Sequence, residues 1–409
     1  MLSLYRVNSE QASTYYTKDD YYLQEVGYWH GQTGTALGYT GVIAEKDFQA
    51  LIRGLDNRDE PRFEIQSGGQ KNIHSAGVDL TFSAPKSVSI AGLVLEDSQI
   101  IEAHNAAVDK TLDYIEKYYT NVRVHENQQV YTEHSGNLLA AKFQHMSSRE
   151  LDPQLHTHCL VMNMSINKDG NMRAMDFGDI YNAKMFLGQM YRSELAANLK
   201  DLGYQIETDS KGLFEIKGIP DNIMKEFSTR SEQIRERFEE LRQEFPNRNH
   251  AELKAQATEE TRRRKEEPSH AELRQEWSNR IAEYNITYGE IKHSMDNQSI
   301  PGSQLDINTV IDRALAVATE HEAVARQEDI LRVAAKFGMG EYRVSELQEA
   351  LDNKPEVINL GNNQYTTVAI AEMERKIITT VLSGKDQQPG MEQWQVRGQI
   401  QEYETTHGF

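Results

Sequence analysis

The sequence has a single cysteine, Cys159, among 409 residues. One cysteine excludes an internal disulfide and any zinc finger built from several cysteines. The scarcity also fits a protein that works in a reducing compartment. Disulfides and cysteine-rich metal sites are therefore excluded from the fold and from the chemistry that we expect.

Long hydrophobic runs are also absent. No stretch of 18 apolar residues occurs, whereas a membrane-spanning helix needs about 20. The first residues, MLSLYR, lack the basic and apolar regions of a signal peptide. We therefore expect a soluble, cytoplasmic protein.

Positive charge is scarce. The chain has 44 Lys and Arg against 63 Asp and Glu, a formal net charge of −19 and a pI of about 5.2. Nucleic acid is held mainly by Lys and Arg, so this balance argues against a phosphate-binding protein. A local cationic groove can nevertheless lie on an acidic body. Any contact with nucleic acid should therefore be confined to such a groove.

The remaining composition is that of a globular protein. Hydrophobic residues make up 38% of the chain and charged residues 26%, which excludes collagen-like and wholly disordered chains. The length suggests two or three domains. No internal repeat of 20–50 residues is visible.

Hydrophobic periodicity predicts mixed strands and helices in the first part of the chain. Residues 78–82 alternate as in a half-buried strand, and helices are expected at 86–95 and 100–118. Two further strands, at 137–143 and 156–166, should pair antiparallel. The prediction is an α/β fold with a central antiparallel sheet and flanking helices.

The second part of the chain is more helical. Residues 221–283 are rich in Glu, Arg, Gln and Lys and predict two or three long helices. A polar stretch, SMDNQSIPGS, then indicates a linker. We predict a first domain at residues 1–295, a linker at 296–305, and a small, mainly helical, winged-helix-like module at 306–409.

Three histidines form the strongest chemical signal. His156 and His158 are two residues apart in a predicted strand, so both imidazoles face the same side, and His145 ends the preceding strand. Three converging imidazoles suit a divalent cation and leave positions open for a substrate oxygen. A lone histidine is more often an ordinary core or surface residue, but the pair facing a third favours a metal site.

Two tyrosine pairs and one acidic residue complete a second pattern. Tyr15 and Tyr16 precede Tyr21 and Tyr22 by six residues in a polar segment. A tyrosine oxygen can attack phosphorus when a neighbouring group helps its deprotonation. Asp79 is a candidate for that group and for orienting a histidine.

Both observations also have structural explanations. The tyrosines could pack a helix on a sheet, and Asp79 could face water from an edge strand. Taken together, the two patterns describe a metal-assisted tyrosine transesterification of a phosphodiester.

Two long motifs resemble those of a known family. Residues 77–89 (GVDLTFSAPKSVS), together with FQH at 143–145 and LDPQLHTH at 151–158, are similar to motifs of conjugative relaxases of the TraI/TrwC-like class, MOB-F. The resemblance covers roughly residues 1–295. It implies a histidine–hydrophobic–histidine (HUH) endonuclease that nicks one DNA strand at a plasmid origin of transfer, stays on the 5′ end, and rejoins the strand after transfer.

The resemblance also implies roles for individual residues. Tyr15 would be the nicking nucleophile and Tyr21 would act in the second strand transfer, with Tyr16 and Tyr22 as supporting or alternative members. Asp79 would orient a metal-bound histidine and assist deprotonation of the tyrosine. The family's basic residue falls at Arg264 or Lys265.

The loop residue Arg149 is a further candidate DNA contact. The run at residues 262–265 could instead be a solvated helix face paired with the neighbouring glutamates.

Cofactor and partners follow from the same resemblance. The metal would be Mg²⁺ or Mn²⁺, with Zn²⁺ also compatible with imidazoles. The partners would be single-stranded DNA of the origin of transfer, with its hairpin and nick site, relaxosome accessory proteins, a coupling protein and a type IV secretion system. The protein would act in the donor cytoplasm and enter the recipient with the DNA.

The tail resembles the small module that precedes the helicase motor in these proteins. A phosphate-binding loop of the type GxxxxGK[ST] is absent from the sequence, so we expect no helicase activity in this piece. Two other functions stay open, namely a rolling-circle replication initiator with the same chemistry and a non-catalytic DNA-binding module with a structural metal.

Overall fold

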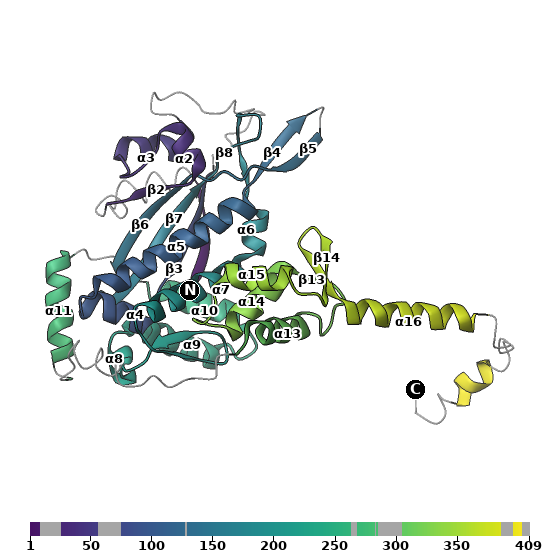
Figure 1. The fold of residues 1–409 in the computed structure, drawn as a ribbon. Helices are drawn as coiled ribbons and strands as arrows, with labels where there is room; N and C mark the ends of the chain where they lie inside the picture. Colours follow the sequence, from purple (N-terminus) through teal and green to yellow (C-terminus); the bar gives the residue numbers. More distant parts are fainter. Residues whose placement is uncertain are drawn as a thin grey trace.

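A five-stranded antiparallel sheet forms the centre of the computed structural model (Figure 1). The structure describes residues 1–8, 26–55, 75–126, 129–262, 268–282, 284, 305–385 and 396–402. The strand order of the five-stranded sheet is β1-β3-β7-β6-β2. The strands are β1 (Leu2–Asn8), β2 (Tyr28–His30), β3 (Ser75–Ser83), β6 (Ala140–Ser147) and β7 (Pro153–Met162). The predicted α/β fold with a central antiparallel sheet is confirmed.

One face of this sheet is covered by helices. Side chains alternate along β3, so Leu80 and Phe82 point to this face. They join a core with the long helices α5 (Ser98–Tyr119) and α7 (Lys184–Asp201), where the Phe82 and Tyr191 rings lie 5.3 Å apart. Figure 1 shows α5 running alongside the sheet. This core fixes the back of the sheet.

The opposite face is only partly covered. Phe143 and Leu160 pack under the short helix α3 (Glu45–Ile52), with the Phe48 and Phe143 rings 5.2 Å apart. This apolar cluster covers the end of the face near Met162. The remaining end carries polar side chains of β3, β6 and β7.

Close backbone approach between β3 and β7 depends on a glycine. A Cβ on Gly77 would lie 2.0 Å from the carbonyl oxygen of Val161, which no side chain could accommodate. Gly77 opens the motif at residues 77–89, and its requirement for glycine is therefore steric. The resulting register places Thr81 opposite His158 and Ser83 opposite His156.

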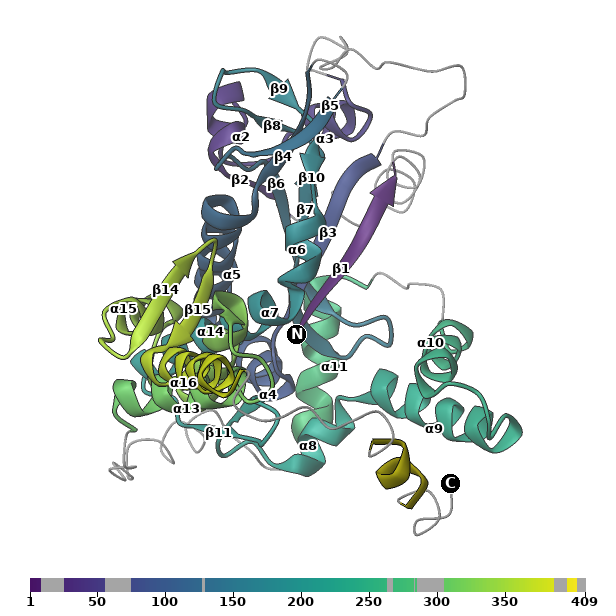
Figure 2. The same ribbon diagram turned by 90° about the vertical axis from the view of Figure 1, so that its right-hand side faces the viewer.

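Small elements surround one end of the sheet. A ribbon of β4 and β5 projects there, together with short strands and helices (Figure 2). These elements are β4 (Asn121–Glu126), β5 (Gln129–His134), β8 (Ser165–Ile166), β9 (Met172–Arg173), β10 (Met175–Asp176), α2 (Gln32–Leu37) and α6 (Gly178–Asn182).

The segment predicted as one helix at 86–95 is helical but irregular. It consists of α4 (Lys86–Ser89) followed by a π-helix, η1 (Ile90–Val94), in which the amide of Leu95 donates to the carbonyl of Ile90. All five residues of η1 are buried. Tertiary packing therefore sets this geometry rather than helical periodicity.

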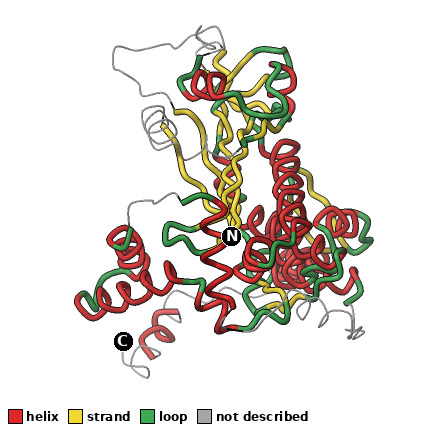
Figure 3. The backbone as a smooth tube through the Cα atoms, turned by 90° about the vertical axis from the view of Figure 1, so that its left-hand side faces the viewer, coloured by secondary structure: helices red, strands yellow, loops and turns green. Residues whose placement is uncertain are grey.

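Helices and a small hairpin extend the fold beyond α7. The hairpin pairs β11 (Ile206–Thr208) with β12 (Phe214–Ile216). The charged region forms a short helix, α8 (Asp221–Glu226), and three longer ones, α9 (Thr229–Glu244), α10 (His250–Glu260) and α11 (His270–Ala282). Figure 3 shows helices (red) on both sides of the strands (yellow), and Figure 2 labels α9 and α10 on one of these sides.

The C-terminal elements pack against the first part of the chain. Helices α13 (Ile307–Ala318), α14 (Gln327–Phe337) and α15 (Val344–Asp352) share the core of α5 and α7. Arg343 reinforces this contact through ion pairs with Glu194, at 2.9 Å, and Asp201, at 2.6 Å. A small sheet, β13 (Ala325–Arg326), β15 (Gln364–Thr367) and β14 (Val357–Gly361), and the projecting helix α16 (Val368–Gly384) complete this part.

The predicted winged-helix likeness and the domain boundaries at 295 and 305 stay predictions. Most of the predicted linker, residues 296–304, lies outside the described residues. Within the described ranges, no helix is both long and apolar enough to cross a membrane.

Candidate functional site

Three imidazoles meet on the partly open face of the sheet. Antiparallel pairing puts His145 of β6 directly opposite His156 of β7, and His158 lies two residues further along the same face. The ring centroids of His145 are 5.3 Å from those of both His156 and His158, and the latter two are 5.2 Å apart. The structure thus brings together the three histidines that the sequence singled out.

Asp79 orients one of these rings. Its Oδ2 lies 2.7 Å from Nδ1 of His158, and the hydroxyl of Thr81 lies 3.1 Å from the same nitrogen. Asp79 is only 6% exposed, and β3 runs between β1 and β7. The alternative in which Asp79 faces water from an edge strand is therefore wrong.

The donor set fits a metal ion chemically. Nδ1 of His156 lies 2.8 Å from the carbonyl oxygen of Gln154, which can only accept, so this nitrogen carries the proton. Asp79 selects the same tautomer of His158. In the neutral form of either ring, Nε2 then carries the lone pair that a metal ion needs.

The three rings do not yet close on one point. Among the described residues, no three His, Cys, Asp or Glu side chains are already arranged to hold a metal ion. The broad last torsion of a histidine allows the rings to turn inward from their present positions. The site is therefore chemically suited to a cation but not fully closed around one.

Residues of the SAPKSVS motif hold the start of β7. The ammonium of Lys86 donates to the carbonyl of Pro153 at 2.9 Å, and the hydroxyl of Ser89 accepts from the amide of Leu155 at 3.0 Å. Burial lowers the pKa of Lys86 to about 8, against the opposing effect of Asp152. The motif thus fixes the strand that carries two of the histidines.

The loop before β7 is anchored from the other side by α9 and α11. Asp152, 1% exposed, accepts from the amide of Thr229 at 2.8 Å and pairs with Arg280 at 3.3 Å. The indole of Trp277 donates to the carbonyl of Leu151 at 2.7 Å. The charged helical region is therefore bound directly to the histidine loop, a contact that the sequence did not predict.

A buried histidine supports β7 from behind. The two ring nitrogens of His104 lie 2.7 Å from the hydroxyl of Tyr191 and 2.8 Å from that of Thr157, the residue between His156 and His158. Burial lowers the pKa of His104 to about 3, so the ring is neutral near pH 7. The available signal was its position in the apolar stripe of the 100–118 helix, between Ile101 and Val108.

One exposed aromatic residue also lies beside the site. Tyr5 of β1 pairs with Asp79 and therefore shares its face, where it is 63% exposed. No motif had drawn attention to it.

The other predicted residues are placed as follows. Arg149 is half-buried in the loop between β6 and β7. The remaining predicted site residues lie outside the described residues; they are Tyr15, Tyr16, Tyr21, Tyr22, Arg264 and Lys265.

Comparisons of the sequence and the fold with known proteins point to the same family. The TrwC relaxase family matches residues 9–284, more than half of the chain. The chain is 38% identical over 252 residues to the multifunctional conjugation protein TraI of Escherichia coli. That match covers 58% of the chain but only 14% of TraI, so the chain spans a small part of the curated relatives that it matches.

Solved structures of TrwC agree in fold and sequence. A TrwC complex with a 27-mer DNA comprising the recognition hairpin and the cleavage site has a TM-score of 0.63 and 35% identity. A metal-bound TrwC complex with oriT DNA has a TM-score of 0.62 and 35% identity. Each match covers 70% of this chain and 100% of the TrwC chain. On these grounds the chain belongs to the TrwC relaxase family.

Proposed function

We propose that the chain is the nicking part of a plasmid conjugative relaxase. It would cut one strand of DNA at an origin of transfer, keep the 5′ phosphate on a tyrosine, and rejoin the strand after transfer. The observation that carries this proposal is the cluster of His145, His156 and His158, oriented by Asp79, on the open face of a relaxase-family sheet.

The topology of the sheet supports a role for the N-terminal tyrosines. β1 ends at Asn8 on one edge, and β2 begins at Tyr28 on the opposite edge. The chain between them, which contains both tyrosine pairs, therefore connects the two edges. We infer that Tyr15 acts at the histidine face, because helices α5 and α7 occupy the other face.

The reaction is a transesterification. The phenol of Tyr15 loses its proton, its oxygen forms a bond to phosphorus, and the bond from phosphorus to the 3′ oxygen breaks. The 3′ oxygen takes up a proton, which leaves a free 3′-hydroxyl and a 5′-phosphotyrosine. Asp79 would orient His158 and assist the deprotonation. Tyr21 would serve the second transfer, with Tyr16 and Tyr22 as supporting or alternative members.

The three imidazoles would hold a divalent cation, with Mg²⁺ or Mn²⁺ as first candidates and Zn²⁺ as a third. When bound, such an ion polarises a phosphate oxygen and stabilises the charge that develops on it. The metal-bound TrwC complex with oriT DNA supports a metal in this family, and the identity of the ion in this chain is part of the proposal.

Family membership supports a proposal for the DNA and protein partners. The DNA would be a single strand with a recognition hairpin and a nick site, contacted by Arg149 and by Arg264 or Lys265. Relaxosome accessory proteins, a coupling protein and a type IV secretion system would act together with the relaxase. It would work in the donor cytoplasm and pass into the recipient with the DNA.

Denaturing gel electrophoresis tests the proposal. The protein is mixed with Mg²⁺ or Mn²⁺ and single-stranded DNA from the transfer origin of its own plasmid. We expect a slow-migrating protein–DNA adduct that Tyr15→Phe abolishes. The matched control, Tyr181→Phe, changes a tyrosine that is 41% exposed on α6 and should retain the adduct.

A second variant separates binding from cleavage. His156→Ala should abolish the adduct while leaving much of the DNA binding intact. Free cleaved ends without an adduct would instead indicate a metal-dependent hydrolase. Binding without any cleavage by the unaltered protein would indicate a non-catalytic DNA-binding module.

A further inference from the structure

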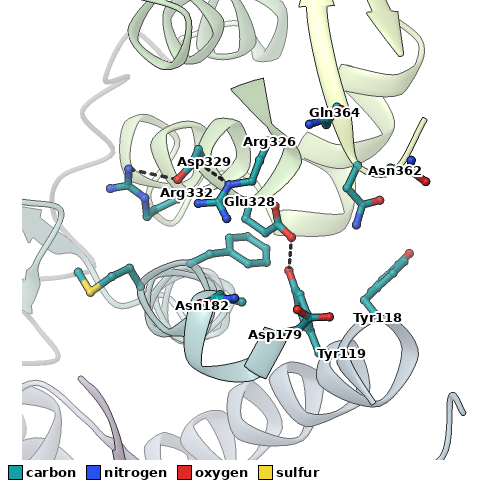
Figure 4. Close-up of a pocket in the computed structure, with 14 residues that line it drawn as sticks. Tyr118, Tyr119, Asp179, Asn182, Arg326, Glu328, Asp329, Arg332, Asn362 and Gln364 are labelled. Atoms are coloured by element: carbon teal, nitrogen blue, oxygen red, sulfur yellow. Dashed lines mark hydrogen bonds and ion pairs between the residues drawn. The ribbon is translucent and has the colours of Figure 1, made fainter. Parts of the chain in front are cut away.

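A polar pocket lies between the relaxase-like part of the chain and the C-terminal elements. Its volume is about 240 Å³. One wall comes from the end of α5 and from α6 and α7, and the other from β13, α14 and the β14–β15 turn (Figure 4). The pocket is lined in part by α5 and α7, which cover one face of the sheet, whereas the histidines lie on the opposite face. It is therefore separate from the proposed cleavage site.

Glu328 is the key acceptor in this pocket. Its Oε1 accepts a hydrogen bond from the hydroxyl of Tyr119 at 3.2 Å. Its buried Oε2 has no hydrogen-bond partner within the part of the chain that the structure describes. A buried carboxylate oxygen without a donor is costly. The broad last torsion of a glutamate lets this oxygen turn towards a donor in the pocket.

The charges around the pocket argue against a simple ion. Asp179, Glu328 and Asp329 face Arg326 and Arg332, so three negative groups accompany two positive ones. The guanidinium of Arg326 already pairs with Asp329 at 3.2 Å. A free anion would meet three carboxylates, and a free cation would meet two guanidinium groups. A neutral ligand with hydrogen-bond donors suits this balance better.

Amide side chains provide directional hydrogen bonding at the rim. They come from both walls of the pocket and are Asn182, Asn362, Asn363 and Gln364. Figure 4 shows the Tyr118 hydroxyl directed towards Asn362. The Tyr119–Glu328 pair lies between these two residues and Arg332. Amides, carboxylates and aromatic walls are the groups with which proteins read the edges of unpaired bases.

The turn that carries two of these amides is fixed in position. Asn362 and Asn363 both have positive φ, 50° and 57°, as expected for a tight hairpin turn. The carbonyl of Asn363 accepts a hydrogen bond of 2.8 Å from the amide of Gln327 at the start of α14. The rim is thus preorganised and loses little freedom on binding.

We propose that this pocket binds one unpaired nucleobase with an exocyclic amino group, supplied by a single DNA strand. The amino group would donate to Glu328, the rim amides would contact the base edge, and Arg326 would face the phosphate. A volume of about 240 Å³ is of the size of a base with part of its sugar. The proposal rests on the proposed function, in which the chain handles single-stranded DNA.

Hydrogen–deuterium exchange of the full chain tests this assignment. The probe is (dC)12, a strand without the recognition hairpin, compared with (dT)12, whose bases lack an amino group. We expect (dC)12 to protect residues 326–332 and 362–364 at lower concentration than (dT)12. In Glu328→Gln, half-maximal protection should need about tenfold more (dC)12, the scale of one good base contact.

Control variants and a second probe distinguish a general effect of substitution from loss of the pocket, and a DNA strand from a free nucleotide as the ligand. Glu374→Gln makes the same chemical change on exposed α16 and should behave as the unaltered protein. Gln364→Ala, on the rim, should weaken protection without touching the buried carboxylate. Protection by dCMP as strong as that by the strand would assign the pocket to free nucleotides instead.

Equal protection by (dC)12 in the unaltered protein and both pocket variants would overturn the proposal. So would the absence of protection by any of these probes. Nicking is measured separately in the adduct assay, which does not involve Glu328. Loss of the adduct with intact protection of the pocket would therefore count against the proposed function and not against this site.

Discussion

The hydrogen bond between Asp79 and His158 links the carboxylate proposed to assist deprotonation of the tyrosine to one of the proposed metal ligands. Replacing Asp79 by Asn keeps its shape but removes the charge that fixes the His158 tautomer. Loss of such a partner typically lowers metal affinity or activity by about 10–100-fold. We expect Asp79→Asn to reduce adduct formation on this scale and to leave binding of the hairpin DNA unchanged in fluorescence anisotropy. Asp221→Asn, at an exposed position of α8, is the control, and full activity of Asp79→Asn would contradict the assigned role.

His104 couples the stability of the sheet to pH. Its pKa is lowered by burial from 6.5 to about 3 in the folded protein. Well above pH 6.5 the ring is neutral in both states, so it has no effect there. As pH falls from 6.5 towards 3, the unfolded chain binds a proton that the folded protein does not, and folding stability decreases. At pH 5 the loss from this residue amounts to about 2 kcal/mol.

Urea denaturation between pH 7.5 and 5 measures this effect. His104→Gln retains polar atoms for Tyr191 and Thr157 but cannot titrate. We expect its unfolding free energy to fall less steeply with acidification than that of the unaltered protein. Parallel pH profiles for the two proteins would show that His104 does not carry the loss.

At the scale of elements, helix α11 helps to link the helical region to the loop that precedes the histidines of β7. Arg280 pairs with buried Asp152 and also stacks on Phe227, with its guanidinium carbon 4.5 Å from the ring centroid. Arg280→Gln removes the charge partner of Asp152, while Thr229 still donates to it. A charged hydrogen bond of this kind contributes about 2 kcal/mol. We expect the free energy of unfolding, measured by urea denaturation, to fall by this amount and amide exchange in the loop before β7 to become faster. The exposed control Arg274→Gln should show neither effect.

Periodic elements were predictable from the sequence because their signal is local. The alternation in β3 and the apolar stripe of α5 depend on residues within a few positions of each other. The burial of Asp79 was not predictable, because an acidic residue in an edge strand and one in an interior strand look alike. Its partner His158 is far away in the sequence, so only the register of the strands determines whether the two side chains meet. The π-helix was missed for a similar reason, since a wholly buried segment has no periodicity.

At the scale of the whole molecule, the C-terminal elements are part of the same packed body as the sheet. The pairing of Arg343 with Glu194 and Asp201, and the bond between Tyr119 and Glu328, cross between the two predicted domains. The sequence indicated a linker from its polar composition, but composition carries no information about what the module packs against. This contact also creates the pocket at the junction.

The salt dependence of DNA binding should reflect the small number of proposed cationic contacts in this acidic chain, whose net charge is −19. With few cationic side chains at the site, only about two or three phosphates would be neutralised, which gives a slope of about −2 in log affinity against log salt for a single strand. Stacking on aromatic side chains such as Tyr5 would supply salt-independent affinity, about 1–3 kcal/mol per base. Fluorescence anisotropy with the hairpin DNA from 50 to 200 mM salt, about a fourfold range, measures the slope.

Two variants separate the charged contacts from stacking. Arg149→Ala should make the slope shallower by somewhat less than one unit, which corresponds to the loss of about one phosphate contact. Tyr5→Ala should weaken binding without changing the slope. A slope as steep as about −6 would instead require a cationic surface comparable to that of a basic duplex binder.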